Sequence, residues 1–257
     1  MANHEYSAHG IEEESYFVSM TDLMVGMLFV FIIMLMAFAL NLREQQDKFD
    51  QTTDALTQAN QTRKEMLEDI AKQLAKRGVI VFIDRENGIL RLPEEMLFPR
   101  GQYELTAKGH DALNQLANVL EVVLPCYAQS SIIPASCPPN RKGRLEALFI
   151  EGHTDDKPIA SRMANGISNN WELSTERAIT TFNALREHEP MLQSLSNDSR
   201  QKLLGVSGYA EFRPVKTENT EEAKAANRRI DLRFLMATPT TAELSNIKGR
   251  VERGMAK

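Results

Sequence analysis

The feature that most constrains this chain is an unbroken apolar run near its N-terminus. Residues Leu23 to Leu40 carry no charged side chain, and an extension back to Phe17 adds only Asp22. At about 1.5 Å per residue, a helix over 17–40 reaches roughly 36 Å, which exceeds the roughly 30 Å of hydrocarbon in a bilayer. We therefore predict a transmembrane helix at residues 17–40, because a water-soluble helix of this length needs a polar face.

A cleaved signal peptide is the main alternative, since Ala37-Phe38-Ala39 has the small residues of a cleavage site. Signal peptides begin with a basic segment, whereas residues 1–16 contain four glutamates and neither Lys nor Arg. The same charge distribution bears on orientation, because cytoplasmic flanks are usually basic. Lys and Arg occur only after the span, which disfavours a cytoplasmic N-terminus, although a tail this short is easily kept on either side.

Asp22 lies at the start of the predicted span. An ionised carboxylate in lipid costs several kcal/mol unless it faces a protein partner or a water-filled cavity, and such residues mark ion and proton pathways. The alternative is a helix cap at the membrane interface, helped by Ser19 and Thr21. The residues by themselves leave both roles open.

Residues 41–77 contain neither Pro nor Gly and are rich in Gln, Lys, Glu and Ala, which predicts a helical linker. A narrow apolar stripe suits either a weak coiled coil, and hence a homodimer, or a helix lying on another surface. A solvated spacer helix is the remaining alternative. The stripe consists of Leu42, Phe49, Leu56, Met66, Ile70 and Leu74.

From residue 78 the pattern changes to short strands and amphipathic helices, which predicts an α+β domain at 78–237 and a tail at 238–257. Strands are expected where apolar and β-branched residues cluster or alternate, and helices where apolar residues recur at steps of three to four. Asn87-Gly88 predicts a hairpin turn. The expected strands are 79–84, 89–92, 148–150, 204–207 and 229–234, and the expected helices are 106–123, 174–187 and 191–203.

Four polar clusters fall where these elements end. They are Gly152-His153-Thr154-Asp155, the run from Asn170 to Ala178, Gly208-Tyr209-Ala210-Glu211 with Pro214, and Asn227-Arg228-Arg229-Ile230. In this order and spacing they closely resemble the signature of the OmpA/MotB peptidoglycan-binding domain, over roughly residues 78 to 236. The resemblance implies an α/β sandwich in which helices cover one face of a mixed sheet.

The resemblance also implies a peptidoglycan-binding site formed by Thr154, Asp155, Asn170, Leu173 and Arg177. Stem peptides carry diaminopimelate, whose side chain ends in both an ammonium and a carboxylate. Asp155 supplies an anion, and Arg177, expected at a partly exposed helix start, supplies a planar fork that matches a carboxylate. Thr154, Asn170 and Leu173 supply hydrogen bonds and an apolar wall. An internal salt bridge between Asp155 and Arg177 is the alternative.

The residues favour binding over catalysis, and we expect neither an enzyme nor a cofactor. His153, Asp155 and Asp156 lack a further cluster of metal ligands, so no metal site is predicted. Ser174 lies at a helix start rather than on a nucleophile elbow, and neither cysteine adjoins a histidine. The net charge of −5, without a clustered basic face, disfavours nucleic acid as a partner.

The segment from Tyr16 to Met24, with the Phe- and Met-rich span after it, resembles the transmembrane helix of MotB-type stator subunits. The aspartate that matches Asp22 binds the proton that drives an ion-powered motor in that family. The resemblance implies a homodimer whose helices pass through a pentameric ring of a multi-span MotA/ZorA-like membrane protein.

The run from Ser19 to Phe29 and a cysteine-bearing insertion are more similar to the ZorB subunits of Zorya anti-phage systems, whereas flagellar MotB proteins usually have a basic N-terminal tail. We therefore expect the B subunit of a proton-driven inner-membrane motor in anti-phage defence. A flagellar-type stator subunit and a passive OmpA-like wall tether are the alternatives.

Cys126 and Cys137 lie in this Pro-rich insertion. The family resemblance places the domain in the periplasm, where an oxidising environment favours a disulfide between them. The implied topology is a single-pass protein of the bacterial inner membrane, with a cytoplasmic tail at 1–16 and a periplasmic C-terminal domain.

Overall fold

The computed structural model describes residues 9–129, 134, 135, 137, 143–159 and 166–238, with the backbone alone for 9–19. Most of the two predicted tails therefore lies outside the described residues. Contacts within the chain divide it into two units, whose described parts lie within residues 9–53 and within residues 54–238. The long first helix contributes to both.

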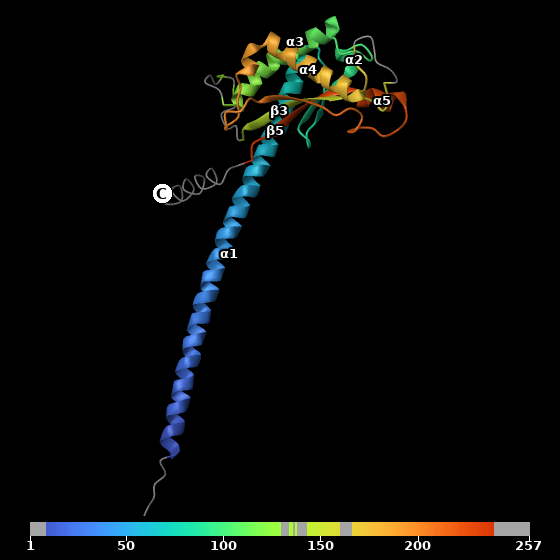
Figure 1. Cartoon of the computed structure of the whole chain (residues 1–257). Helices are drawn as coiled ribbons and strands as arrows, with labels where there is room; N and C mark the ends of the chain where they lie inside the picture. Colours follow the sequence, from blue (N-terminus) through green and yellow to red (C-terminus); the bar gives the residue numbers. More distant parts are fainter. Residues whose placement is uncertain (1–8, 130–133, 136, 138–142, 160–165, 239–257) are drawn as a thin grey trace, which may run out of the picture. The chain divides into compact units, whose positions relative to one another are not determined.

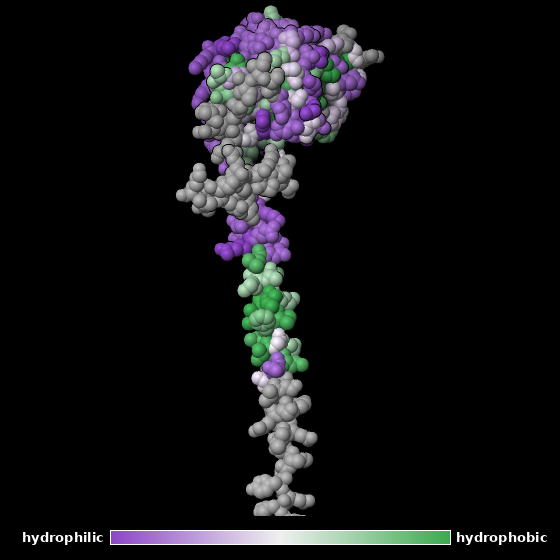
Figure 2. Space-filling view, turned by 90° about the vertical axis from the view of Figure 1, so that its left-hand side faces the viewer, coloured by the Kyte–Doolittle hydropathy of each residue, from purple (hydrophilic) through white to green (hydrophobic). Residues whose placement is uncertain are grey.

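Helix α1 (His9–Lys76) contains the apolar run (Figure 1). It is long and apolar enough to cross a membrane. Every large apolar side chain from Leu23 to Leu40 is exposed on it, and Figure 2 shows these residues as a continuous apolar band on the helix. Apolar side chains on all sides of a helix are what contact with lipid requires.

The end of α1 belongs to the second unit. Met66, Leu67, Ile70 and Leu74 are fully buried there in the hydrophobic core. The second half of the predicted linker 41–77 is thus a core helix of the domain, whereas the apolar stripe of its first half, at Leu42, Phe49 and Leu56, is exposed.

Five strands form one mixed sheet in the order β1-β2-β5-β3-β4. Strands β3 and β4 are parallel, and the other neighbours are antiparallel. The turn at Asn87-Gly88 joins β1 to β2 as a hairpin, because Asp84 pairs with Ile89. The strands are β1 (Phe82–Asp84), β2 (Ile89–Pro93), β3 (Leu145–His153), β4 (Leu204–Gly208) and β5 (Arg229–Met236).

Helices α3 and α4 cover one face of this sheet (Figure 1), and the apolar residues of β3 and β5 face them in the core. Alternate residues of the same strands project from the other face, where charged side chains gather. The predicted fold, helices on one face of a mixed sheet, is confirmed. The helices after α1 are α2 (Glu94–Leu97), α3 (Ala107–Val123), α4 (Asn170–His188) and α5 (Glu221–Asn227), with 3-10 turns at Leu124–Cys126 and Pro190–Gln193.

The predicted helix at 191–203 is wrong. A 3-10 turn ends at Gln193, and the chain then turns irregularly. The side chain of Asn197 donates to the backbone of Glu146 and accepts from the backbone of Gln201, and Arg200 has a φ of 62°. Side-chain bonds to the backbone and a left-handed residue both compete with a helix.

Helix α4 begins four residues before the predicted start, because Asn169 caps it by accepting a hydrogen bond from the Glu172 backbone. Helices α2 and α5 were not predicted. Cys126 and Cys137 form a disulfide, with Cα atoms 5.4 Å apart. Much of the Pro-rich loop that it closes lies outside the described residues.

Candidate functional site: a charged cavity at the ends of the parallel strands

Two glycines let helix α4 start directly against the ends of β3 and β4. A Cβ atom at Gly152 would collide with the carbonyl oxygen of Ser174, and one at Gly208 would collide with the Thr175 hydroxyl. The Ser174 hydroxyl accepts a hydrogen bond from the backbone of Ala210 (3.1 Å). Ser174 therefore holds the fold together, and the loops after β3 and β4 lie beside the first turns of α4.

A cavity of about 400 Å³ opens at this place. All five predicted binding residues line it, so the structure brings together side chains from the loop after β3 and from α4. Four of the lining side chains are cationic and two are anionic. The lining residues are Glu94, Arg100, Gly101, Thr154, Asp155, Lys157, Pro158, Ile159, Asn170, Leu173, Arg177 and Arg228.

Four of these side chains form a row of alternating charge, which we call the cavity charge row. Arg177 Nη2 lies 2.6 Å from Glu94 Oε1, Glu94 Oε2 lies 2.8 Å from Arg228 Nε, and Arg228 Nη1 lies 2.7 Å from Asp155 Oδ2. Each charge has an opposite neighbour, which offsets the cost of removing the four groups from water.

The row corrects the expected exposure of Arg177 and contradicts the alternative of an Arg177–Asp155 salt bridge. The residue is 2% exposed rather than partly exposed, and its ion-pair partner is Glu94 rather than Asp155. Its Nε also donates to the backbone carbonyl of Gln102 (2.8 Å). Burial lowers the pKa of the Arg177 guanidinium, and the Glu94 carboxylate opposes that shift. The short helix α2, which carries Glu94, is the physical reason for both differences.

Two buried oxygen atoms of the lining have no hydrogen-bond donor among the described residues, namely Thr154 Oγ1 and Glu94 Oε2. The 2.8 Å contact of Glu94 Oε2 with Arg228 is an ion pair whose alignment is too poor for a hydrogen bond. Unsatisfied buried polar atoms cost free energy. Both atoms therefore lack a hydrogen bond that a donor group could supply, and Glu94 Oε2 keeps its ion pair with Arg228.

Asn170 and Leu173 have different positions in the wall. Asn170 Nδ2 lies within hydrogen-bond distance of the carbonyls of Asp155 (3.3 Å) and Lys157 (3.2 Å) and of Glu211 Oε2 (3.2 Å). Its amide thus ties together the loops after β3 and β4. Leu173 is buried and supplies an apolar part of the lining.

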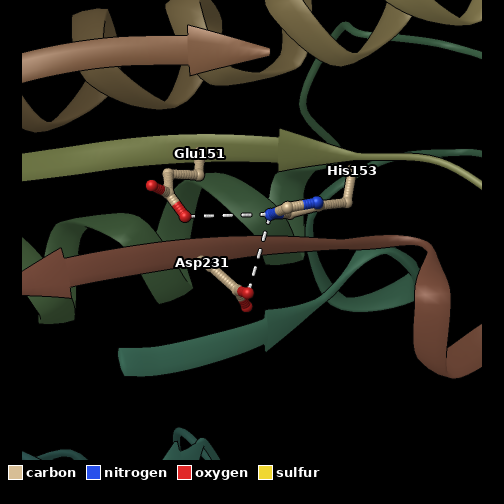
Figure 3. A group of neighbouring side chains, drawn as sticks. All are labelled: Glu151, His153 and Asp231. Atoms are coloured by element: carbon tan, nitrogen blue, oxygen red, sulfur yellow. Dashed lines mark ion pairs between the residues drawn. The ribbon is translucent and has the colours of Figure 1, made fainter. Parts of the chain in front are cut away.

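A second set of buried charges lies on the sheet face opposite to α3 and α4, and we call it the closed charge network. Its centre is His153, whose Nε2 lies 3.6 Å from Asp231 and 4.0 Å from Glu151 (Figure 3). Neither ring nitrogen makes a hydrogen bond within the described residues. Tyr209 stacks on the imidazole, with centroids 5.4 Å apart, and Arg213 lies 3.7 Å over the Tyr209 ring.

Glu151, His153 and Asp231 offer ligand atoms within 4.8 Å of one another, a spacing that a metal ion would fit. Sequence reasoning missed this group because Asp231 belongs to another strand. Arginines already hold both carboxylates, through two bonds of 2.8 Å from Arg233 to Glu151 and bonds of 2.9 and 3.0 Å to Asp231 from Arg229 and Arg91. Three guanidinium groups outnumber two carboxylates, so the charge balance disfavours a cation.

Burial lowers the pKa of His153 to about 2, and the charges of the surrounding arginines, Arg229 first, add to the shift. The imidazole is therefore neutral across the physiological range. Arg91, Arg229 and Arg233 complete the closed charge network, because they form ion pairs with the two carboxylates drawn in Figure 3.

Sequence reasoning also missed two members of the cavity charge row. Arg228 belongs to the Asn227-Arg228-Arg229 cluster, so its motif was visible while its role was not. Glu94 sits in a Pro-Glu-Glu run that carries no pattern of its own. The remaining candidate, Asp22, directly precedes the apolar band of α1 in the first unit.

Comparisons with known proteins agree with this architecture. No protein-family model matches the chain. Motility protein B of Bacillus subtilis is 33% identical over 88 residues, which cover 34% of this chain and 30% of that protein. The chain thus spans less than a third of that relative. The Zorya protein ZorB of Escherichia coli O139:H28 is 24% identical over 229 residues, which cover 86% of this chain and 80% of ZorB.

Among solved structures, a MotB-like protein of Desulfovibrio vulgaris matches with a TM-score of 0.50 and 21% identity, over 74% of this chain and 98% of that one. At this identity the likeness concerns the fold. The chain therefore shares the α/β fold of this MotB-like protein, and part of it is similar in sequence to Motility protein B.

Proposed function

We propose that the cavity binds the stem peptide of peptidoglycan at its diaminopimelate residue and so anchors the membrane-attached chain to the cell wall. The observation that carries this proposal is the cavity charge row, in which Asp155 stands at one end and Arg177 at the other. A side chain that ends in both an ammonium and a carboxylate matches such a row, with its ammonium at Asp155 and its carboxylate at Arg177 or Arg228.

The rest of the lining fits the same ligand. Thr154 Oγ1 has no hydrogen-bond partner among the described residues and could accept one from an ammonium or amide group. Arg100 and Lys157 add positive charge, although both are also paired with Glu221. The excess of cationic groups suits a stem peptide, which carries more than one carboxylate.

Asp155→Asn tests the wall site, because it removes the anion and keeps the shape. The full chain in detergent is sedimented with purified wall sacculi. We expect binding to fall at least about tenfold, as for the loss of a buried charge-assisted contact. Asp111→Asn, an exposed change on α3, is the matched control.

A second arm uses sacculi whose stem peptides carry lysine in place of diaminopimelate. Lysine keeps the ammonium and lacks the carboxylate, so we expect weaker binding of the unchanged chain. Equal sedimentation of folded Asp155→Asn and unchanged protein would refute the site, and equal binding to both kinds of wall would refute the carboxylate contact.

We also infer that the chain is the B subunit of a proton-driven inner-membrane motor that works as a homodimer with a multi-span MotA/ZorA-like partner. Asp22 supports this, since a passive tether gains nothing from a carboxylate in an apolar span. The similarity to ZorB along 86% of the chain supports a role in anti-phage defence. A flagellar-type stator subunit remains the second candidate.

Asp22→Asn tests the motor, because it removes a proton-binding group and keeps a similar size. Expressed with its multi-span partner in a phage-sensitive host, the variant should lose protection while it still inserts and binds the partner. Asp22→Glu should keep part of the activity. Full protection by Asp22→Asn would exclude a proton-carrying role.

The proposed topology places the α/β domain in the periplasm. The Cys126–Cys137 disulfide offers the test, because cytosolic thiols are kept reduced. Alkylation of protein from cells without reductant should leave both cysteines unlabelled, and prior reduction should expose both. Complete labelling without reductant would contradict the periplasmic location.

A further inference from the structure

An exposed pair of aromatic rings lies beside the proposed wall site. Trp171 and Phe212 stack with their ring centroids 5.4 Å apart and their planes 21° apart. Trp171 is 51% exposed and Phe212 is 66% exposed. Large apolar side chains held in water forgo the free energy of burial, and such surfaces commonly mark binding sites.

The pair is attached to the rim of the cavity. Trp171 follows Asn170, which lines the cavity, and Phe212 follows Glu211. These two preceding residues are hydrogen-bonded to each other (3.2 Å). The backbone of Phe212 also donates to the carbonyl of Tyr209 (3.1 Å). Both rings therefore stand on backbone that is already ordered, so that a ligand would not have to order it.

The sequence neighbours of the two rings are polar. Asn169 and Glu172 are exposed on the same end of α4, and Glu211 and Arg213 flank Phe212 in the loop after β4. A partner helix or a lipid would call for a broader apolar surface. A small aromatic face edged with hydrogen-bonding groups suits a ligand that is itself apolar on one face and hydroxylated at its rim.

We propose that Trp171 and Phe212 form a second subsite, which stacks against a sugar ring of the glycan strand while the cavity holds the stem peptide. A pyranose ring presents a face of C–H groups, which the electron-rich face of an aromatic ring attracts, and its hydroxyls project sideways toward polar neighbours. The inference rests on the proposed function, since the sugar reaches this place only through the peptide attached to it.

The covalent distance between the two ligand parts agrees with this arrangement. Diaminopimelate is the third residue of the stem, so roughly 10 Å of extended backbone, at about 3.5 Å per residue, and the length of its own side chain separate the recognised group from the sugar. Trp171 directly follows a lining residue of the cavity. One muropeptide can therefore occupy both subsites.

Trp171 is the only tryptophan of the chain, so intrinsic fluorescence reports on this subsite directly. The full chain in detergent is titrated with a disaccharide-tripeptide that contains diaminopimelate and with the same tripeptide without sugar. We expect the disaccharide-tripeptide to shift the tryptophan emission and to bind about tenfold tighter than the tripeptide. The tripeptide should bind with little change in emission.

In Phe212→Ala, the disaccharide-tripeptide should bind at most about threefold tighter than the tripeptide, as expected for the loss of one aromatic contact. Its affinity for the tripeptide, measured by calorimetry, should stay unchanged. Phe82→Ala, which removes an exposed aromatic ring from β1, is the matched control and should change neither affinity.

The outcomes separate the two proposals. If the tripeptide binds and the sugar adds nothing, the sugar subsite is wrong and the wall site stands. If neither compound binds to folded protein, both proposals fail. An emission shift that depends on protein concentration without any ligand, and disappears in Phe212→Ala, would assign the rings to contact with a second copy and overturn the sugar subsite.

Discussion

The cavity charge row and the closed charge network are both buried sets of ion pairs, and each includes a residue of the segment where β3 ends. His153 ends β3 in the closed network, and Asp155, two residues later, belongs to the row. The row borders a cavity of about 400 Å³ and leaves acceptor atoms unsatisfied. In the closed network, arginines occupy both carboxylates, and Tyr209 covers the imidazole.

The comparison teaches that buried charge by itself does not indicate a binding site. Three guanidinium groups hold the two carboxylates of the closed network, and none of its residues lines the described cavity. In the row, each carboxylate and guanidinium has an internal partner too, but the cavity gives a ligand access to them. We therefore expect changes in the closed network to affect stability, and changes in the row to affect stability and binding together.

Arg177→Ala should have the largest effect. It leaves Glu94 with one cationic partner instead of two, and breaking a buried ion pair costs about 3 to 5 kcal/mol in the free energy of unfolding. Denaturant unfolding of the full chain in detergent measures this loss, and sedimentation with sacculi should show that wall binding falls as well. An unchanged stability would mean that the row does not stabilise the fold.

Asp231→Asn should lower the free energy of unfolding by about 3 kcal/mol, because Arg229 and Arg91 lose a charged partner. Wall binding should stay unchanged at temperatures where the variant is folded. This variant is the most direct test of the comparison. Weaker binding by folded Asp231→Asn would show that the two regions are coupled.

His153 should make stability depend on pH. Its pKa is about 2 in the folded chain and about 6.5 in the unfolded chain. The unfolded state therefore takes up a proton below about pH 6.5 and the folded state does not, so this contribution is complete above that pH and is lost as the pH falls. Between about pH 7.5 and 5.5 we expect a loss of about 1.4 kcal/mol.

His153→Gln should remove this dependence of the free energy of unfolding on pH, whereas His110→Gln, at an exposed position on α3, should keep it. The free energy of unfolding is measured at several pH values within this window, where few carboxylates titrate. The same slope in His153→Gln would mean that the imidazole is not held neutral in the folded chain.

Thr154→Val should have the smallest effect. The Thr154 hydroxyl is buried without a hydrogen-bond partner among the described residues, so its removal should leave stability unchanged or slightly higher. Wall binding should weaken by about threefold to tenfold if a ligand donor uses this oxygen. Unchanged binding would place the ligand away from Thr154.

Much of the fold could be predicted because its signals are local. The alternation in β5, the helical period in α3 and the Asn87-Gly88 turn each specify conformation over a few residues. The prediction of a helix at 191–203 was wrong because the spacing of apolar residues gives no information on the hydrogen bonds of the Asn197 side chain to the backbone. Helix α2 was missed because a single turn has no period.

The sequence predicted which residues line the candidate site, and it did not predict which of them form ion pairs. The polar clusters indicated Thr154, Asp155, Asn170, Leu173 and Arg177, and all five line one cavity. Their charge partners could not be inferred, because Arg177 and Glu94 lie 83 residues apart in sequence and Arg228 and Asp155 lie 73 apart.

The sequence by itself determined that a long apolar helix precedes an α/β domain, and where the polar groups of that domain cluster, because hydrophobic period and turn chemistry act between near neighbours. The tertiary structure alone decided which guanidinium meets which carboxylate, and which set of charges borders a cavity. Those choices depend on where β3, α2 and β5 meet in space. Ion pairs are decided by such distances, since their energy falls with the separation of the charges and rises with burial.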